Sequence, residues 1–208
     1  TGTALRYWQE YAAKQAAIEM FGRFLDPIVV QQLAEQGLSE ETQASKQCEI
    51  SILFSDIRGF TTMSEKASAA EIMSLLNAYF TRQVGVIFKN HGTLDKFIGD
   101  AIMAFWGAPL ADERHAINAV NAALDMVDTL EQFRTEHNLP DFDVGIGIHS
   151  GPAVVGMLGC DQRLEYTAIG DTVNLGSRLE GVTKGIARIL VSQSTRDLCG
   201  EYFDFISH

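Results

Sequence analysis

Apolar residues recur along the chain with two different periods, and their alternation predicts a mixed fold. Near the start, apolar residues recur every three to four positions over residues 4–21, which is typical of an amphipathic helix. Asp26-Pro27 then predicts the start of a second short helix, Ile28 to Gln36, because proline suits the first helical position. Residues 38–47 are polar and predict a linker. We therefore expect a helical coupling segment and linker over residues 1–47.

From Cys48 onward, short apolar runs alternate with longer helical patterns. The strands expected are 49–55, 93–96, 101–105, 143–149, 154–157, 164–169 and 188–191. Ser68 and Glu71 form a capping box that opens a helix to about Lys89, and further helices are expected at 112–137, 172–182 and 194–198. This order predicts an α+β domain over residues 48–208, with helices covering one face of a mostly antiparallel sheet.

Composition and net charge limit the classes of function that the chain can have. The chain has 208 residues, 46% hydrophobic and 21% charged, which suits one α/β domain plus a short extra element. A net charge of −11 argues against a nucleic-acid-binding surface and against a basic membrane-binding face. A polyanionic substrate would therefore need a metal ion and a few well-placed Lys or Arg residues.

Cysteine usage indicates a reducing compartment. Cys48, Cys160 and Cys199 are far apart and form no C-x-x-C motif, which argues against a disulfide framework or a zinc site. There is no signal peptide and no apolar run long enough to span a membrane, so we expect a cytoplasmic domain. The chain opens without an initiator Met, so we expect a fragment whose full-length protein could carry an upstream sensor or a membrane domain.

Two aspartates are the candidate metal ligands. Asp56 and Asp100 each close an apolar run that predicts a buried strand. A carboxylate there costs free energy unless a positive group pairs with it, and two together would share a cation such as Mg²⁺. A lone Asp at a strand end is more often a turn former or helix cap, and Gly99-Asp100 also predicts a tight hairpin turn. If the two meet, the hypothesis is a metal-dependent enzyme acting on a nucleoside triphosphate.

Polar residues near these aspartates are candidate substrate contacts. Gly59, beside Phe60 and Thr61, would offer backbone N–H groups to phosphate oxygens. Lys96 lies in an apolar stretch and needs an acceptor, which could be a purine ring nitrogen or the carboxylate of Asp95 or Glu165.

A second polar pair lies downstream. Asn174 and Arg178 are four residues apart and share one helix face, where an amide and a guanidinium could clamp sugar and phosphate oxygens. An ordinary polar helix face is the alternative.

Four linked motifs carry a family resemblance: F-S-D-I-R-G-F-T, D-K-F-I-G-D-A-I-M-A-F, G-I-G-I-H-S-G and Y-T-A-I-G-D-T-V-N-L-G-S-R-L-E. In this order and spacing, from about Glu49 to Val191, the chain resembles the catalytic domain of class III nucleotidyl cyclases. The resemblance implies a ferredoxin-like or palm-type antiparallel sheet covered by helices. It also implies cyclisation of ATP or GTP to the 3′,5′-cyclic monophosphate and pyrophosphate.

The resemblance implies a role for each candidate. Asp56 and Asp100 would hold two Mg²⁺ or Mn²⁺ ions per active site, with Ile57 contributing its carbonyl. The remaining roles are phosphate binding by the backbone of Gly59, Phe60 and Thr61, purine recognition by Lys96 and Thr167, ribose orientation by Asn174, and phosphorane stabilisation by Arg178.

The purine pair predicts the substrate. Lys96 can donate to N1 of adenine, and Thr167 can accept from its N6 amine, whereas guanine reverses both groups. GTP-using members of the family resemble this chain but carry Glu and Cys at these positions, so Lys and Thr predict an adenylyl cyclase of the bacterial type. The Thr hydroxyl can also donate, which allows residual GTP use. The alternatives are guanylyl cyclase activity and a catalytically weak domain that binds nucleotide and regulates a partner.

The resemblance also implies a second copy of the chain. In this family the metal carboxylates come from one domain, and the purine pair, Asn and Arg come from the other. Because this chain carries both sets, we expect a head-to-tail homodimer with two active sites, oriented by the front helices. The family usually continues past the position of His208 with a further strand pair, so we expect the C-terminal part to be truncated.

Overall fold

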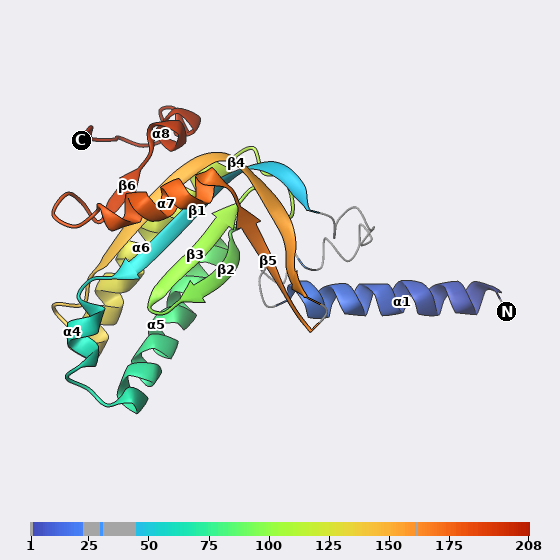
Figure 1. Ribbon diagram of the computed structural model, residues 1–208, viewed down its shortest axis with the longest axis horizontal. Helices are drawn as coiled ribbons and strands as arrows, with labels where there is room; N and C mark the ends of the chain where they lie inside the picture. The colour runs from blue at the N-terminus through green and yellow to red at the C-terminus, as the bar shows by residue number, and fades with distance from the viewer. Residues whose placement is uncertain (1, 23–29, 31–44, 161) are drawn as a thin grey trace.

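The computed structural model describes residues 2–22, 30, 45–160 and 162–208. The helices are α1 Gly2–Phe21, α4 Phe60–Ser64, α5 Ala69–Lys89, α6 His115–His137, α7 Asp171–Gly181 and α8 Gln193–Cys199. The strands are β1 Lys46–Ile57, β2 Thr93–Ile98, β3 Ala101–Trp106, β4 Val144–Cys160, β5 Arg163–Ile169 and β6 Ile189–Val191 (Figure 1).

The described strands form one sheet with the order β2-β3-β1-β4-β5, and β6 pairs with the first part of β4. Every pairing is antiparallel except that of β6 with β4. The predicted α+β class and the mostly antiparallel sheet are therefore confirmed.

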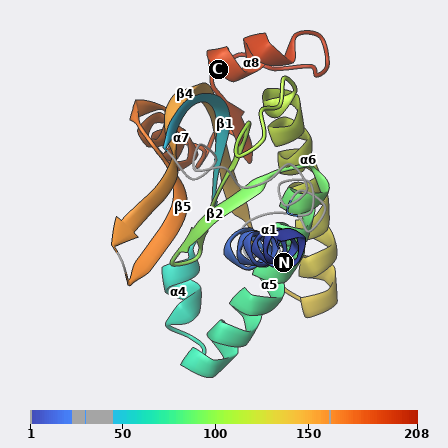
Figure 2. The ribbon, with the colours of Figure 1, turned by 90° about the vertical axis from the view of Figure 1, so that its right-hand side faces the viewer.

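The helices lie on both faces of the sheet, so the prediction that they cover one face was wrong. Helices α5 and α6 pack on one face and α7 on the other, as Figures 1 and 2 show from two directions. Side chains alternate along β1: Leu53 points to the α5–α6 core, whereas Ile52 and Phe54 point to α7. Because both faces of the central strands are covered, these strands are apolar at nearly every position.

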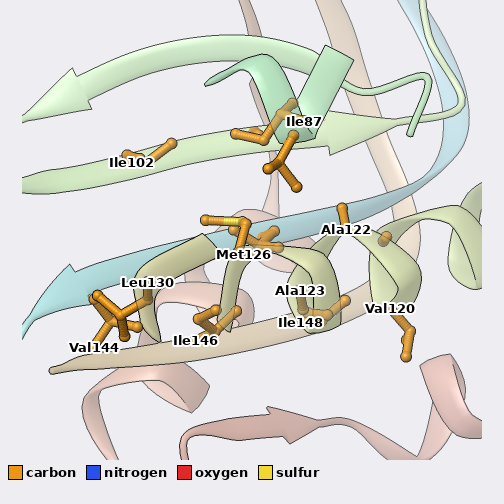
Figure 3. Packing of buried hydrophobic residues seen from close by; sticks show 14 of the residues in the cluster. Ile87, Ile102, Val120, Ala122, Ala123, Met126, Leu130, Val144, Ile146 and Ile148 are labelled. Carbon is orange, nitrogen blue, oxygen red and sulfur yellow. The ribbon is translucent and has the colours of Figure 1, made fainter. Parts of the chain in front are cut away.

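The larger core lies between the sheet and α6. Met126 and Leu130 of α6 pack against Val144, Ile146 and Ile148 of β4 (Figure 3). These side chains are almost completely excluded from solvent. Burial of these and the other apolar side chains of the cluster holds the helical layer on the strands.

Strand β4 is continuous where the sequence predicted two strands, 143–149 and 154–157. It runs through Gly151 and Pro152, which stay paired with Ile50 and Glu49 of β1. Pro152 lies between the stretches of β4 that pair with β6 and with β5. Among the described strands, only β1 neighbours β4 in that stretch, so the missing N–H of proline interrupts no second described ladder.

Two further boundaries differ from the prediction. Helix α6 begins at His115 and not at Asp112, whose carboxylate instead accepts hydrogen bonds of 2.8 Å from the Arg114 N–H and from Asn118 Nδ2. Asp112 thus stabilises the turn that precedes the helix. Lys46 and Gln47 already belong to β1, so the sheet begins two residues before the predicted domain boundary.

The front segment is described only in part. The predicted first helix is confirmed as α1, but Leu5 and Trp8 on its apolar stripe are 63% and 65% exposed. The predicted second helix and most of the linker fall on residues 23–29 and 31–44, outside the described residues; within that range Val30 is described and is buried. No described helix combines the length and apolar character needed to cross a bilayer.

Candidate active site

Asp56 and Asp100 are adjacent, which meets the condition on which the metal-site hypothesis depended. Asp56 is the penultimate residue of β1, and Asp100 follows Gly99 in the turn between β2 and β3. Pairing of Ser55 with Ile102 brings that turn to the end of β1. Partial burial and then the neighbouring Asp56 carboxylate raise the pKa of Asp100 to about 6. Asp100 is therefore both a hairpin-turn residue, as the alternative held, and one half of a carboxylate pair.

Negative charge accumulates around this pair. Burial and then Asp56 raise the pKa of Glu180, on α7, to about 6, although Arg58 acts in the opposite direction. Among the described residues, no salt bridge involves Asp56 or Asp100, and no three His, Cys, Asp or Glu side chains are grouped to hold a metal ion. Two adjacent oxygen ligands without a cationic partner suit a hard divalent ion that keeps sites for phosphate. No sequence signal marks Glu180 beyond its place at the end of the fourth motif.

The predicted phosphate loop lies directly after β1. Gly59 has φ of 69°, a left-handed conformation that favours glycine, and it precedes the short helix α4. Phe60 packs against the core, while Thr61 is exposed. The first N–H groups of a helix have no partner within it. In α4 these include the N–H groups of Phe60 and Thr61, which lie four and five residues beyond Asp56.

Lys96 and Thr167 also lie close together, although they come from the two terminal strands in the sheet order. The sheet curls so that β2 meets β5, and Thr167 Oγ1 is 2.8 Å from Asp95 Oδ2. Lys96 Nζ is 2.6 Å from Glu165 Oε2 and 3.6 Å from Asp95 Oδ1. Both carboxylates that the sequence allowed as partners of Lys96 are thus partners. The contact of Asp95 with Thr167 was not predicted.

Asn174 and Arg178 lie on the exposed side of α7, opposite the buried Thr172 and Gly176. Neither side chain makes a hydrogen bond or an ion pair with any residue that the structure describes. A guanidinium with no acceptor in the described part of the chain is available to a ligand or to a second molecule.

Glycines of the third motif explain how α7 is seated. Gly145, Gly147 and Gly151 are on the face of β4 toward α7. A Cβ added at Gly147 would lie 2.3 Å from the backbone N of Glu180, far inside van der Waals contact. The backbone of α7 therefore packs directly against the backbone of β4, with no side chain between them at these glycines. This contact sets the position of Arg178 relative to the sheet.

We expect Gly147→Ala to destabilise the domain by about 1–3 kcal/mol, because α7 must shift to admit the methyl group. The midpoint of thermal unfolding should fall by several degrees. Gly85→Ala on α5 is the matched control: a Cβ there meets nothing within 4 Å, and alanine favours the helix, so its midpoint should not fall. Equal stability of Gly147→Ala and wild type would show that α7 is not held this closely.

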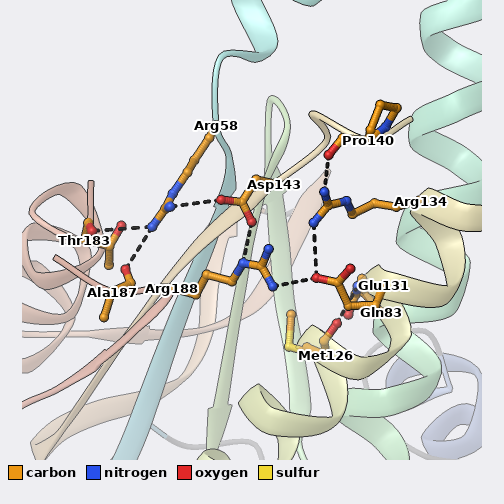
Figure 4. Close-up of polar contacts among 10 residues, drawn as sticks. All are labelled: Arg58, Gln83, Met126, Glu131, Arg134, Pro140, Asp143, Thr183, Ala187 and Arg188. Atoms are coloured by element: carbon orange, nitrogen blue, oxygen red, sulfur yellow. Dashed lines mark hydrogen bonds and ion pairs between the residues drawn. The ribbon is translucent and has the colours of Figure 1, made fainter. Parts of the chain in front are cut away.

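A network of ion pairs anchors the strand that carries Asp56 (Figure 4). Arg58 binds Asp143 at 2.9 Å and donates to the Ala187 carbonyl at 2.8 Å. Asp143 also pairs with Arg188 at 2.6 Å, and Arg188 binds Glu131 of α6 at 2.6 Å. The network ties the end of β1 to the loop after α7 and to α6. Sequence reasoning missed Arg58 as a positioning residue, although it lies two residues beyond Asp56.

The predicted residues therefore form separate groups on one chain. Among the described residues, no hydrogen bond or ion pair joins Lys96 and Thr167 to the carboxylate pair, or either group to Asn174 and Arg178.

The mostly antiparallel sheet and its covering helices match the fold of solved adenylyl and guanylyl cyclase domains. Residues 42–207 match the family model described as the adenylate and guanylate cyclase catalytic domain. The chain belongs to that family.

Known proteins similar to this chain include both kinds of cyclase. Adenylate cyclase 1 of Rhizobium meliloti (strain 1021) is 42% identical over 171 residues, which are 81% of this chain and 26% of that protein. The structure of the guanylyl cyclase Cya2 matches with a TM-score of 0.72 and 36% identity, covering 76% of this chain and 81% of the other. The structure of the adenylyl cyclase CyaB from P. aeruginosa matches with a TM-score of 0.70 and 35% identity, and the match covers 75% of this chain and 82% of the other. Overall similarity therefore does not distinguish ATP from GTP as substrate.

Proposed function

We propose that this domain is an adenylyl cyclase that converts ATP to 3′,5′-cyclic AMP and pyrophosphate. The observation that carries the proposal is that Lys96 and Thr167 lie on either side of Asp95, which both contact where β2 meets β5. Lys96 offers a donor to N1 of adenine, and Thr167 offers an acceptor to the N6 amine. Guanine presents a donor and an acceptor at the corresponding positions, which leaves buried polar groups unpaired.

Asp56 and Asp100 would hold two Mg²⁺ or Mn²⁺ ions, together with the carbonyl of Ile57. Bound divalent ions would lower the pKa of the ribose 3′-hydroxyl and neutralise charge on the leaving pyrophosphate. The backbone of Gly59, Phe60 and Thr61 would hold phosphate oxygens, and Asn174 would orient the ribose. Arg178 would stabilise the charge that develops on the α-phosphate during transfer.

We infer that two copies of the chain build the site head to tail, one supplying the carboxylates and the other Lys96, Thr167, Asn174 and Arg178. Arg178 has no hydrogen-bond or ion-pair partner among the residues that the structure describes, which supports this arrangement. So do the exposed apolar side chains on and after the β4–β5 hairpin, Val154, Leu158, Ile169 and Leu175. Apolar groups gathered on an exposed surface mark an interaction site.

The test is product formation from ATP and from GTP, measured side by side with Mn²⁺ on the full-length protein. We expect cyclic AMP as the main product. Mostly cyclic GMP would overturn the interpretation of Lys96 and Thr167 and favour guanylyl cyclase activity. No product from a verified dimer would overturn the enzymatic proposal in favour of a nucleotide-binding regulatory domain.

Exchange of the purine pair should change the substrate. We expect Lys96→Glu with Thr167→Cys to lower the ratio of kcat/KM for ATP to that for GTP by about a hundredfold or more, because both hydrogen-bonding groups are reversed. The control is Lys89→Glu with Thr81→Cys, which makes the same chemical changes at exposed positions of α5. An unchanged ratio in the first double variant would disprove base recognition by this pair.

A further inference from the structure

Asp95 is a buried carboxylate between the two residues that would recognise the purine. It lies on β2 at an irregularity in the pairing with β3, between Leu94 and Lys96. The residue is only 4% exposed, and its side chain is completely covered. A buried carboxylate is costly unless it accepts hydrogen bonds. Its partners therefore show what it does in the fold.

Every polar group that contacts Asp95 is a donor. Thr167 Oγ1 lies 2.9 Å from Oδ1 and 2.8 Å from Oδ2. The Ala168 N–H donates to Oδ2 at 3.1 Å, and the Lys96 ammonium lies 3.6 Å from Oδ1. An ionised carboxylate can only accept, so in the bond between Thr167 and Asp95 the hydroxyl of Thr167 must donate.

The hydrogen bond to Asp95 uses the single hydrogen of the Thr167 hydroxyl. A threonine hydroxyl has one hydrogen and two lone pairs, and it normally rotates to suit its neighbour. Here the hydrogen points into the protein toward Asp95, so the oxygen has only lone pairs left for a ligand. The N6 amine of adenine can donate to them, whereas O6 of guanine would bring a second acceptor against them.

We propose that Asp95 is a specificity-determining positioning residue, which selects adenine by orienting the hydroxyl of Thr167 so that Thr167 can only accept. This inference rests on the proposed function, because it requires Thr167 to face the base. It removes the ambiguity of a freely rotating hydroxyl, which would tolerate GTP. The proposed role distinguishes Asp95 from Glu165, because Glu165 contacts Lys96 but, among the hydrogen bonds of the described residues, not Thr167.

Asp95→Asn is the direct test, because it keeps the shape and adds an N–H donor toward Thr167. The hydroxyl hydrogen is then free to turn to the base. We expect the ratio of kcat/KM for ATP to that for GTP to fall about tenfold or more, with the value for GTP rising. In a Thr167→Val background the same substitution should leave the ratio unchanged, because the hydroxyl through which Asp95 acts is absent.

Asp143→Asn is the matched control, since it also removes a partly buried carboxylate with cationic partners, Arg58 and Arg188. It should lower thermal stability and leave the ratio unchanged. A folded Asp95→Asn protein that keeps the wild-type ratio, or that loses ATP and GTP turnover equally, would overturn the inference and leave Asp95 as a structural link between β2 and β5.

A measurement on the unaltered protein covers the case in which Asp95→Asn does not fold. N6-methyl-ATP and 6-methoxypurine riboside triphosphate have nearly the same shape and the same N1 acceptor, but only the first has an N–H at position 6. An accept-only Thr167 should favour N6-methyl-ATP by about tenfold or more. Equal use of both would overturn the inference.

Failure of the proposed function would be recognised separately. If the wild-type dimer makes no cyclic nucleotide, the enzymatic proposal fails, and specificity is then read from calorimetric binding of 3′-deoxy-ATP and 3′-deoxy-GTP. A preference for 3′-deoxy-ATP that Asp95→Asn lowers supports the role of Asp95. A preference that the substitution does not change overturns it.

Discussion

Asp56→Asn or Asp100→Asn should reduce cyclic AMP formation by about a thousandfold or more, because loss of a metal ligand removes several kcal/mol of transition-state stabilisation. For Asp100→Asn, we expect activity to fall while the stability of the folded domain does not. The pKa of Asp100 is raised to about 6 in the folded protein, so the ionised form that prevails at pH 7 opposes folding. Asn cannot ionise, so we expect the thermal midpoint of Asp100→Asn at pH 7 to equal or exceed that of the wild type.

The measurement is initial rate with saturating Mn²⁺, together with thermal unfolding and the oligomeric state of each variant. Asp128→Asn is the matched control, since it removes an exposed carboxylate from α6, on the sheet face away from α7. It should leave rate and assembly unchanged. A near wild-type rate for either Asp56→Asn or Asp100→Asn would refute the metal assignment.

Two inactive variants should restore activity to each other if the site is shared between chains. We expect Arg178→Ala to lose about a hundredfold to a thousandfold in kcat, as for removal of a group that stabilises transition-state charge. When Arg178→Ala is mixed with Asp56→Asn and the subunits are exchanged, half of the dimers are mixed. In each mixed dimer one site has both defects and the other has none, so about a quarter of the wild-type activity should return.

The control mixture combines Asp56→Asn with Asp100→Asn. Both residues would come from the same half of the site, so every site in this mixture keeps a defect and no activity should return. Exchange of subunits is verified with two affinity tags before either rate is measured. No recovery in the first mixture, or equal recovery in both, would refute the head-to-tail site and leave each chain with a complete site of its own.

The sequence alone determined features that depend on neighbouring residues. The capping box is an example: the Ser68 N–H donates to Glu71, and the Glu71 N–H donates to Ser68 Oγ, so α5 begins at the next residue, Ala69. The apolar runs located the strands, and the short hairpin brought Asp100 to the strand end that carries Asp56. The four motifs, each a local run of residues, were sufficient to identify the family.

The tertiary structure decided what depends on residues distant in the chain. An amphipathic pattern shows that α7 has a buried side, but not which face of the sheet covers it. That face depends on glycines of β4 that lie about 30 positions earlier and admit the helix backbone. Likewise, no local pattern relates Asp95 to Thr167, 72 residues later, because their contact requires the sheet to curl until β2 meets β5. Periodicity records which residues are buried, whereas the partner of a buried group is set by strand order, twist and packing of the whole sheet.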